Sequence, residues 1–157
     1  MPKSKTDSKL DELEQQIIQE MRRTYSEKTL DHAMRPRNVG RIEDPSGYAR
    51  VTGPCGDTME IYLRIERNRV ADAKFWTDGC GTAIACGSVA TELVKDKIAA
   101  DAGKIGSEHI LGHLGGLPEP DLHCAILAAQ TLNAAIQDYR NRKRKSIRGE
   151  YAAKQLL

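Results

Sequence analysis

Three of the four cysteines in this sequence occupy positions where a thiol can take part in chemistry. Cys55 lies in the Gly/Pro turn GPCGD, Cys80 in DGCGT, where an alternating pattern changes to a helical one, and Cys124 in DLHC, in the first turn of the last predicted helix. Asp57 and His123 lie beside two of them and offer a carboxylate and an imidazole. Because the helix macrodipole favours anions at a helix start, we expect Cys80 and Cys124 to be stabilised as thiolates.

Three thiolates with one weaker ligand suit two kinds of metal centre. By ligand count, the three cysteines with Asp57 or His123 fit zinc, and they fit an iron–sulfur cluster equally well. Each cysteine comes from a separate segment, and in a two-layer fold the ends of such segments can converge on one edge of the domain. The simpler roles stay open at this point: a turn-forming aspartate at Asp57 and a partly exposed histidine at His123.

The fourth cysteine and the other histidines fit structural roles better. Cys86 shares a helical stripe with Ala83, Ala90 and Leu93, so we expect it in the core. The remaining histidines have no thiol neighbour in the sequence, and we expect them to be solvated or at the edge of the core: His32, His109 and His113.

Length and composition favour one intracellular domain. A chain of 157 residues with 39% hydrophobic residues can bury a genuine core, and a net charge of +2 is too small to indicate nucleic-acid binding. The N-terminal segment has no apolar core of signal-peptide length, its acids fit a mitochondrial presequence poorly, and no run approaches the roughly 20 apolar residues that span a bilayer. We therefore expect a cytoplasmic protein with reduced thiols that binds neither membrane nor nucleic acid.

Apolar spacing predicts helices first and strands next. From Ser8 to about Arg23 apolar residues recur at helical spacing, and Ser8 and Asp11 are placed like a capping box, which indicates an amphipathic N-terminal helix. A shorter helix ends before Pro36. The alternating segments TMEIYLRIE and VADAKFWT then predict a hairpin with one solvent-exposed face, which YARVT extends to three strands. In the second alternating segment we expect Ala71 to share the inner face with its alternating neighbours.

The remaining pattern is helical. It runs from Gly81 to about Lys97, passes through a Gly-broken stretch, and resumes at Asp121 in a last helix whose buried side we expect to include Ile126. The fold class is therefore α+β: a small antiparallel three-stranded sheet covered on one face by helices. We divide the chain into an N-terminal helix (1–24), a central domain (25–140) and a basic tail (141–157). The tail, which contains RNRKRKS, is expected to be a solvated, fraying helix end.

Four segments together resemble a known family. YSEKTLDHAMRPRNVGRI, GPCGDTMEIYLRI, ADAKFWTDGCGTAIACGSVATELVKDK and LHCAILAAQTLNAAI are similar, in the same order, to the iron–sulfur cluster assembly scaffolds of the IscU and NifU N-terminal type. The resemblance implies a non-catalytic α+β scaffold on which a [2Fe-2S] cluster is assembled and then transferred to apo-proteins. It places the family's cysteines on Cys55, Cys80 and Cys124, its aspartate on Asp57 and its histidine on His123.

The resemblance also implies partners. Sulfide would come from a pyridoxal-phosphate cysteine desulfurase, electrons from a donor such as a ferredoxin, and apo iron–sulfur proteins would receive the cluster. A homodimer can form when the cluster is bound. Zinc can take the place of the cluster in the same site.

Two features depart from the family pattern. The segment LPEPD, Leu117 to Asp121, replaces the Leu-Pro-Pro-Val-Lys motif that a dedicated Hsp70 chaperone binds, so we do not expect chaperone-driven release. Asp121 replaces the lysine; as an N-cap it could accept the N–H of His123 or Cys124, and its charge would oppose thiolate formation at Cys124. The second departure is Cys86, where many relatives have serine.

Two other functions compete with the scaffold. One is a zinc-dependent sulfur acceptor of the SufU type, whose members carry an insertion between the second and third cysteine regions that this sequence lacks. The other is a thiol hydrolase with Cys124 and His123 as a dyad. We disfavour the hydrolase because adjacent residues on a helix point about 100° apart and seldom share a hydrogen bond.

Overall fold

The computed structural model describes residue 2 and residues 4–156. The elements follow in the order α1 (Lys5–Thr24), α2 (Glu27–Met34), β1 (Gly47–Thr52), β2 (Thr58–Glu66), β3 (Arg69–Thr77), α3 (Gly81–Val94), α4 (Ala99–Ala102), α5 (Ser107–Leu114), a 3-10 turn η1 (Glu119–Asp121) and α6 (Leu122–Gln155). The strands form one antiparallel sheet in the order β1-β2-β3, which confirms the predicted α+β class. Within the described residues, no helix is both long enough and apolar enough to cross a bilayer.

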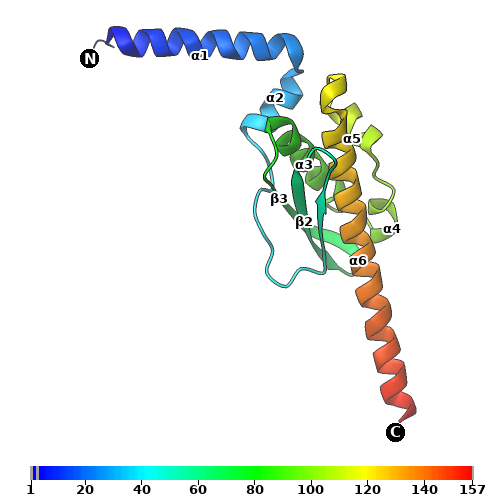
Figure 1. Cartoon of the computed structure of the whole chain (residues 1–157). Coiled ribbons are helices and arrows are strands. Elements are labelled where there is room, and N and C mark those ends of the chain that lie inside the picture. The colour runs from blue at the N-terminus through cyan, green and yellow to red at the C-terminus, as the bar shows by residue number, and fades with distance from the viewer. Residues whose placement is uncertain (1, 3, 157) are drawn as a thin grey trace.

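The sheet buries one face against helices. Figure 1 shows α3 and α6 packed across it, with α4 and α5 beside them. The inward side chains Met59 and Ile61 of β2 and Phe75 of β3 are at most 1% exposed. Gly87 allows α3 to approach β3 closely, since a Cβ added there would lie 2.4 Å from Cδ2 of Phe75. Aliphatic side chains and small helix residues thus form a single core.

The hairpin differs from the expected alternation in two ways. A register shift between Arg64 and Ile65 pairs Ile65 with Val70, so Val70 is buried while Ala71 is exposed. Our placement of Ala71 on the inner face was therefore wrong, because a β-bulge offsets the period by one residue. The outer face of β2 is also less exposed than expected. Glu60 is 6% exposed because its carboxylate accepts the hydroxyl of Tyr48.

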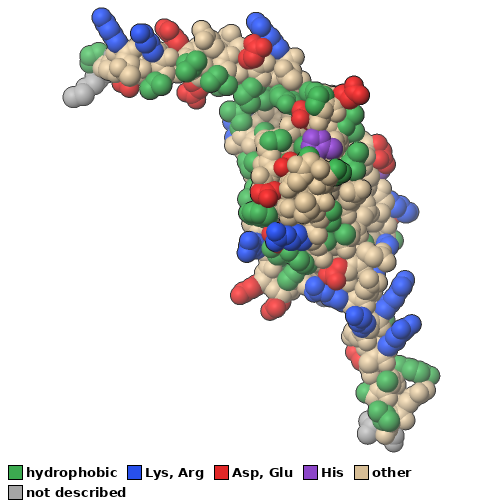
Figure 2. All heavy atoms as spheres, viewed as in Figure 1, with side chains coloured by type: hydrophobic (Ala, Val, Ile, Leu, Met, Phe, Trp, Pro, Cys, Tyr) green, Lys and Arg blue, Asp and Glu red, His purple; other side chains and the backbone are tan. Residues whose placement is uncertain are grey.

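The N-cap of α1 lies four residues earlier than the sequence suggested. Its N-cap is Ser4, whose hydroxyl accepts the N–H of Asp7 at 3.1 Å while the Asp7 carboxylate accepts the N–H of Ser4 at 3.2 Å. The capping box expected at Ser8 and Asp11 is therefore wrong, although the helix and its amphipathic character are confirmed. The helix buries none of its described residues and projects away from the domain, with hydrophobic side chains along one face (Figures 1 and 2).

The last helix is longer than expected. Residues 122–155 form one uninterrupted helix, so the boundary that we drew at residue 140 lies inside α6. Residues 141–156 are exposed and carry many basic side chains, which Figure 2 shows mainly where the helix leaves the domain. Ile126, expected on the buried side, is 47% exposed. Helix α3 ends at Val94, before the expected Lys97.

Candidate metal centre

A tight turn between β1 and β2 presents Cys55 and Asp57. The turn is closed by the N–H of Gly53 bonding to the carbonyl of Asp57 at 2.8 Å, and by the N–H of Gly56 bonding to the carbonyl of Gly53 at 3.0 Å. Gly56 has φ of +88°, a conformation that glycine adopts without steric cost. Cys55 is exposed at the tip, and the Asp57 carboxylate lies against Gly79, where an added Cβ would be 3.1 Å from Oδ2.

Two helix starts supply the other thiols. Cys80 is the N-cap residue of α3 and is exposed, and it makes no side-chain capping bond. Cys124 is the third residue of α6 and only 1% exposed. The sequence placed both at helix starts, as observed, and Cys124 is buried because the core closes over the first turn of α6.

The five predicted side chains come together at one end of the domain. Ligand atoms of Cys55, Asp57 and His123 lie within 4.8 Å of one another, and so do those of Asp57, Cys80 and Cys124. Asp57 belongs to both groups and therefore lies between the exposed and the buried parts of the set. The convergence that the sequence only allowed is thus present in the fold, on residues from three separate segments.

The thiol of Cys124 is strongly protonated in the absence of a metal ion. Burial, followed by the nearby Cys80 and the charge of Asp121, raises the pKa of the Cys124 thiol to about 12. The expectation of a stabilised thiolate at Cys124 is therefore wrong for the metal-free protein, since desolvation outweighs the helix start. As the sequence predicted, the negative charge of Asp121 raises the pKa of Cys124 and so opposes thiolate formation. A bound cation would reverse the balance, because metal binding favours the deprotonated ligand.

Asp121 bonds differently from expectation. It is the N-cap residue of α6, but its side chain makes no capping bond to His123 or Cys124. Instead it accepts the hydroxyl of Tyr25 at 2.8 Å, and this bond is the first cause that raises the pKa of Tyr25. Tyr25 thus fixes the junction of α1 and α2 beside Cys80, across a cavity of about 230 Å³. Sequence reasoning missed this residue, because no spacing pattern marks a lone tyrosine between two helices.

Two further expectations concern neighbouring residues. Cys86 is fully buried within the core cluster, as predicted, and burial raises the pKa of its thiol. The Cys124 sulfur lies 3.5 Å from Nε2 of His123, so the geometric argument against a dyad is wrong. The dyad is still a poor nucleophile for another reason: a thiol that is 1% exposed and has a raised pKa carries little thiolate and admits no substrate.

A known protein family matches most of the chain. Residues 24–146 match the family described as "NifU-like N terminal domain". The chain is 49% identical over 116 residues to the iron-sulfur cluster assembly scaffold protein IscU 1 of Archaeoglobus fulgidus, covering 73% of this chain and 76% of that protein. It is 41% identical over 124 residues to the scaffold protein IscU of Azotobacter vinelandii, covering 76% and 96%. The crystal structure of a nitrogen-fixing NifU-like protein (N-terminal) from Brucella abortus aligns with a TM-score of 0.57 at 19% identity, covering 74% and 94%, and supports the fold.

Proposed function

Because the chain belongs to the NifU-like N-terminal domain family, we propose that it is a scaffold on which an iron–sulfur cluster is assembled and from which the cluster passes to other proteins. The observation that carries this proposal is the convergence of three cysteines, an aspartate and a histidine at one end of the domain. Thiolates are the ligands of iron–sulfur clusters, and among the described residues no other group brings cysteines together in this way.

The proposed ligands are Cys55, Cys80 and Cys124, with Asp57 or His123 as the fourth. Such a set supplies the four positions that a [2Fe-2S] cluster requires. Cys55 and Cys80 are exposed, whereas Cys124 is buried. The cluster would therefore rest on Cys124 and remain accessible from the side of Cys55 and Cys80, which suits a cargo that must leave. A hard oxygen or imidazole ligand beside soft thiolates favours departure further.

The protein acts as a non-catalytic carrier in this proposal, and its partners follow from the chemistry. Sulfide must come from a sulfur donor, for which we propose a cysteine desulfurase. We propose a ferredoxin-type protein as the electron donor and apo iron–sulfur proteins as the recipients of the cluster. We propose a homodimer for the cluster-bound form, and no binding to nucleic acid or to a membrane. The segment Leu117 to Asp121 gives no support for a dedicated Hsp70 partner. For its location we propose the cytoplasm, since the site needs reduced thiols and all four cysteines are free.

Single substitutions test the ligand set. Cys55→Ser, Cys80→Ser and Cys124→Ser would each be reconstituted without oxygen from iron and sulfide and compared by visible absorbance. Each should lose most of the cluster signal. Cys86→Ser is the matched control, because Cys86 is a cysteine of the same chain that lies in the core, and it should keep the cluster. A cluster lost in Cys86→Ser with its fold intact, or kept in all three others, would contradict the assignment.

A zinc-dependent sulfur acceptor of the SufU type is the second candidate, because the same donor set suits tetrahedral zinc. Metal analysis separates the two. Iron and acid-labile sulfide in near-equal amounts favour the scaffold, and colourless protein with one zinc favours the acceptor. In the second case, zinc removal should raise the reactivity of Cys55 and Cys80 toward a persulfide donor.

A further inference from the structure

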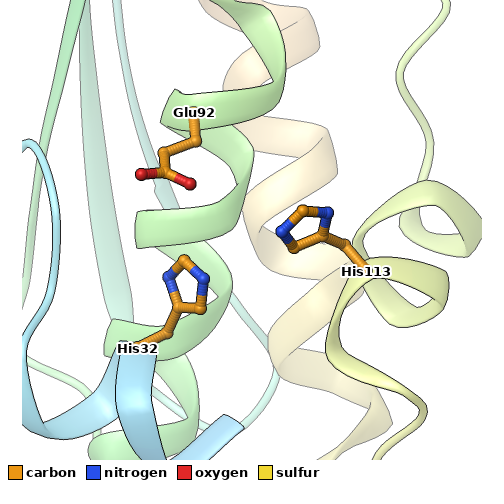
Figure 3. Close-up of side chains that lie close together, drawn as sticks. All are labelled: His32, Glu92 and His113. Atoms are coloured by element: carbon orange, nitrogen blue, oxygen red, sulfur yellow. The ribbon is translucent and has the colours of Figure 1, made fainter. Parts of the chain in front are cut away.

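A second cluster of metal-binding side chains lies where α2, α3 and α5 meet. His32, Glu92 and His113 each present one ligand atom, and these atoms all lie within 4.8 Å of one another. Figure 3 shows the carboxylate and the two imidazole rings turned toward one space between the three helices. The sequence predicted these histidines to be solvated or at the core edge. His32 is instead buried, at 5% exposed, and the fold brings all three side chains together.

We propose that this cluster is a binding site for a divalent cation, and that zinc is the ion it suits best. Two imidazoles and one carboxylate form a ligand set that proteins use for zinc, with the fourth position left to water. The set contains no thiol, so it differs in chemistry from the cysteine site. The proposal does not depend on what is assembled there.

His32 is already held in an orientation suited to a metal ligand. Its Nδ1 lies 2.7 Å from the hydroxyl oxygen of Ser88, and that oxygen also accepts the N–H of Arg37 at 2.9 Å. This contact fixes the ring and leaves Nε2 as the nitrogen available to a cation. Bonding at the second ring nitrogen is the usual way in which proteins orient a histidine ligand. The His113 ring lies edge-on to it, with centroids 5.9 Å apart and planes at 75°.

Binding requires a small contraction that the site can accommodate. Tetrahedral zinc places its nitrogen and oxygen ligands about 3.3 Å apart, so ligand atoms that lie up to 4.8 Å apart must approach by at most about 1.5 Å. Glu92 is exposed and can supply most of that movement. Its carboxylate is 3.8 Å from Nε of Arg37, a loose contact that a cation can replace. Arg37 keeps a closer partner in Asp31, at 2.5 Å, which offsets its positive charge near the site.

The site lies away from the cysteines, and a bound cation there would hold α2 in place. Glu92 lies twelve residues after Cys80, which is about 18 Å along α3 at 1.5 Å per residue. A cation shared by the three helices would cross-link α2 to α3 and α5. At its N-terminus, α2 is already joined to the end of α5 by the hydroxyl of Ser26, which donates to the carbonyl of Leu114 at 2.5 Å. The metal would add a second tie along the helix that follows Tyr25.

A zinc titration of the full chain tests the proposal. In the variant Cys55→Ser/Cys80→Ser/Cys124→Ser, which lacks the thiol ligands, calorimetry should detect one equivalent of zinc. That equivalent should disappear on adding Glu92→Gln or His113→Ala. Glu108→Gln is the matched control, because it removes an exposed carboxylate that lies 3.4 Å from His109 on α5, and it should leave zinc binding unchanged. No bound zinc, or binding unaffected by Glu92→Gln and His113→Ala, would overturn the proposal.

Cobalt substitution gives an answer if the triple variant does not fold. Wild-type protein should bind two equivalents of Co²⁺, of which only one shows sulfur-to-metal charge-transfer absorption. Glu92→Gln should remove the equivalent without that absorption and spare the other. A single equivalent in the wild type, or loss of the sulfur-linked equivalent in Glu92→Gln, would contradict a separate nitrogen and oxygen site.

Discussion

The substitution Asp121→Asn isolates the electrostatic part of the environment of Cys124. Asp121 carries a negative charge near the thiol, and its carboxylate accepts the hydroxyl of Tyr25. Asparagine keeps an oxygen that can accept the same hydrogen bond but removes the charge. We therefore expect the pKa of Cys124 to fall while the junction of α1 and α2 stays in place.

The structure bounds the size of this effect. The pKa of Cys124 is raised from 9.0 to about 12, which corresponds to about 4 kcal/mol against ionisation. The causes all act in the same direction, and the charge of Asp121 ranks third, after burial and Cys80. It can therefore account for at most one third of the change, or about one pKa unit. In the metal-free protein, Asp121→Asn should raise the thiolate population of Cys124 by at most about tenfold.

Alkylation followed by peptide mass spectrometry measures this population. In wild type with metal removed, Cys124 should react with iodoacetamide far more slowly than a free thiol peptide, and Asp121→Asn should speed it by up to about tenfold. Glu119→Gln is the control, because Glu119 is an acidic neighbour of Asp121 in η1 that is not among the groups raising the pKa of Cys124, and it should leave the rate unchanged. An unchanged rate in Asp121→Asn, or wild-type Cys124 as reactive as the free peptide, would refute the reasoning.

Three other predictions concern the cluster, the pH response and the tail. Asp57→Ala should keep a reconstituted cluster longer under chelator and deliver it more slowly to an apo-ferredoxin, because it removes a hard ligand; equal rates by circular dichroism would remove Asp57 from the site. Burial, and after it the charge of Arg37, lowers the pKa of His32 below its ordinary value of 6.5. As the pH falls below 6.5, the unfolded state therefore takes up a proton before the folded state does. Folding stability should fall over this range by at most about 1.4 kcal/mol per pH unit. Urea unfolding in chelator should show a shallower fall in His32→Asn. Truncation after Lys145 should leave cluster assembly unchanged and change the free energy of unfolding by no more than about 0.5 kcal/mol. The residues beyond Lys145 are exposed, and the cut spares Arg142, which donates to the carbonyl of Pro45. Loss of cluster assembly on truncation would instead indicate that the tail docks a partner.

The sequence predicted the parts of the fold that depend on local pattern. The alternation of apolar and polar residues in 58–66 predicted a strand of the sheet, and the helical spacing of apolar residues in 122–136 predicted a helix that covers it. The β-bulge that exposes Ala71 was not predictable, because a single extra residue leaves the alternation of each strand intact when the strands are read separately. Helix ends were off by a few residues for a related reason: Ser4 and Ser8 are both good caps, and packing does not choose between them on an exposed helix.

The sequence predicted candidate side chains that the fold brings together, but not their electrostatics. Turn and helix-start positions marked Cys55, Cys80 and Cys124 as chemical and Cys86 as structural. Burial of Cys124 depends on how the first turn of α6 seats on the core, which no spacing records. The bond from Tyr25 to Asp121 and the meeting of His32 with His113 likewise join residues more than 80 positions apart, so only the folded chain reveals them.

The metal content of the cysteine site is the most direct test of a role in cluster assembly. The protein would be purified without oxygen and its iron, acid-labile sulfide, zinc and ultraviolet–visible spectrum measured on the same sample. We expect brown protein with iron and sulfide in near-equal amounts, and their joint loss in Cys124→Ser but not in Cys86→Ser. Protein without iron or sulfide that also fails to form a cluster on anaerobic reconstitution would contradict the assignment of this fold and these cysteines to cluster assembly.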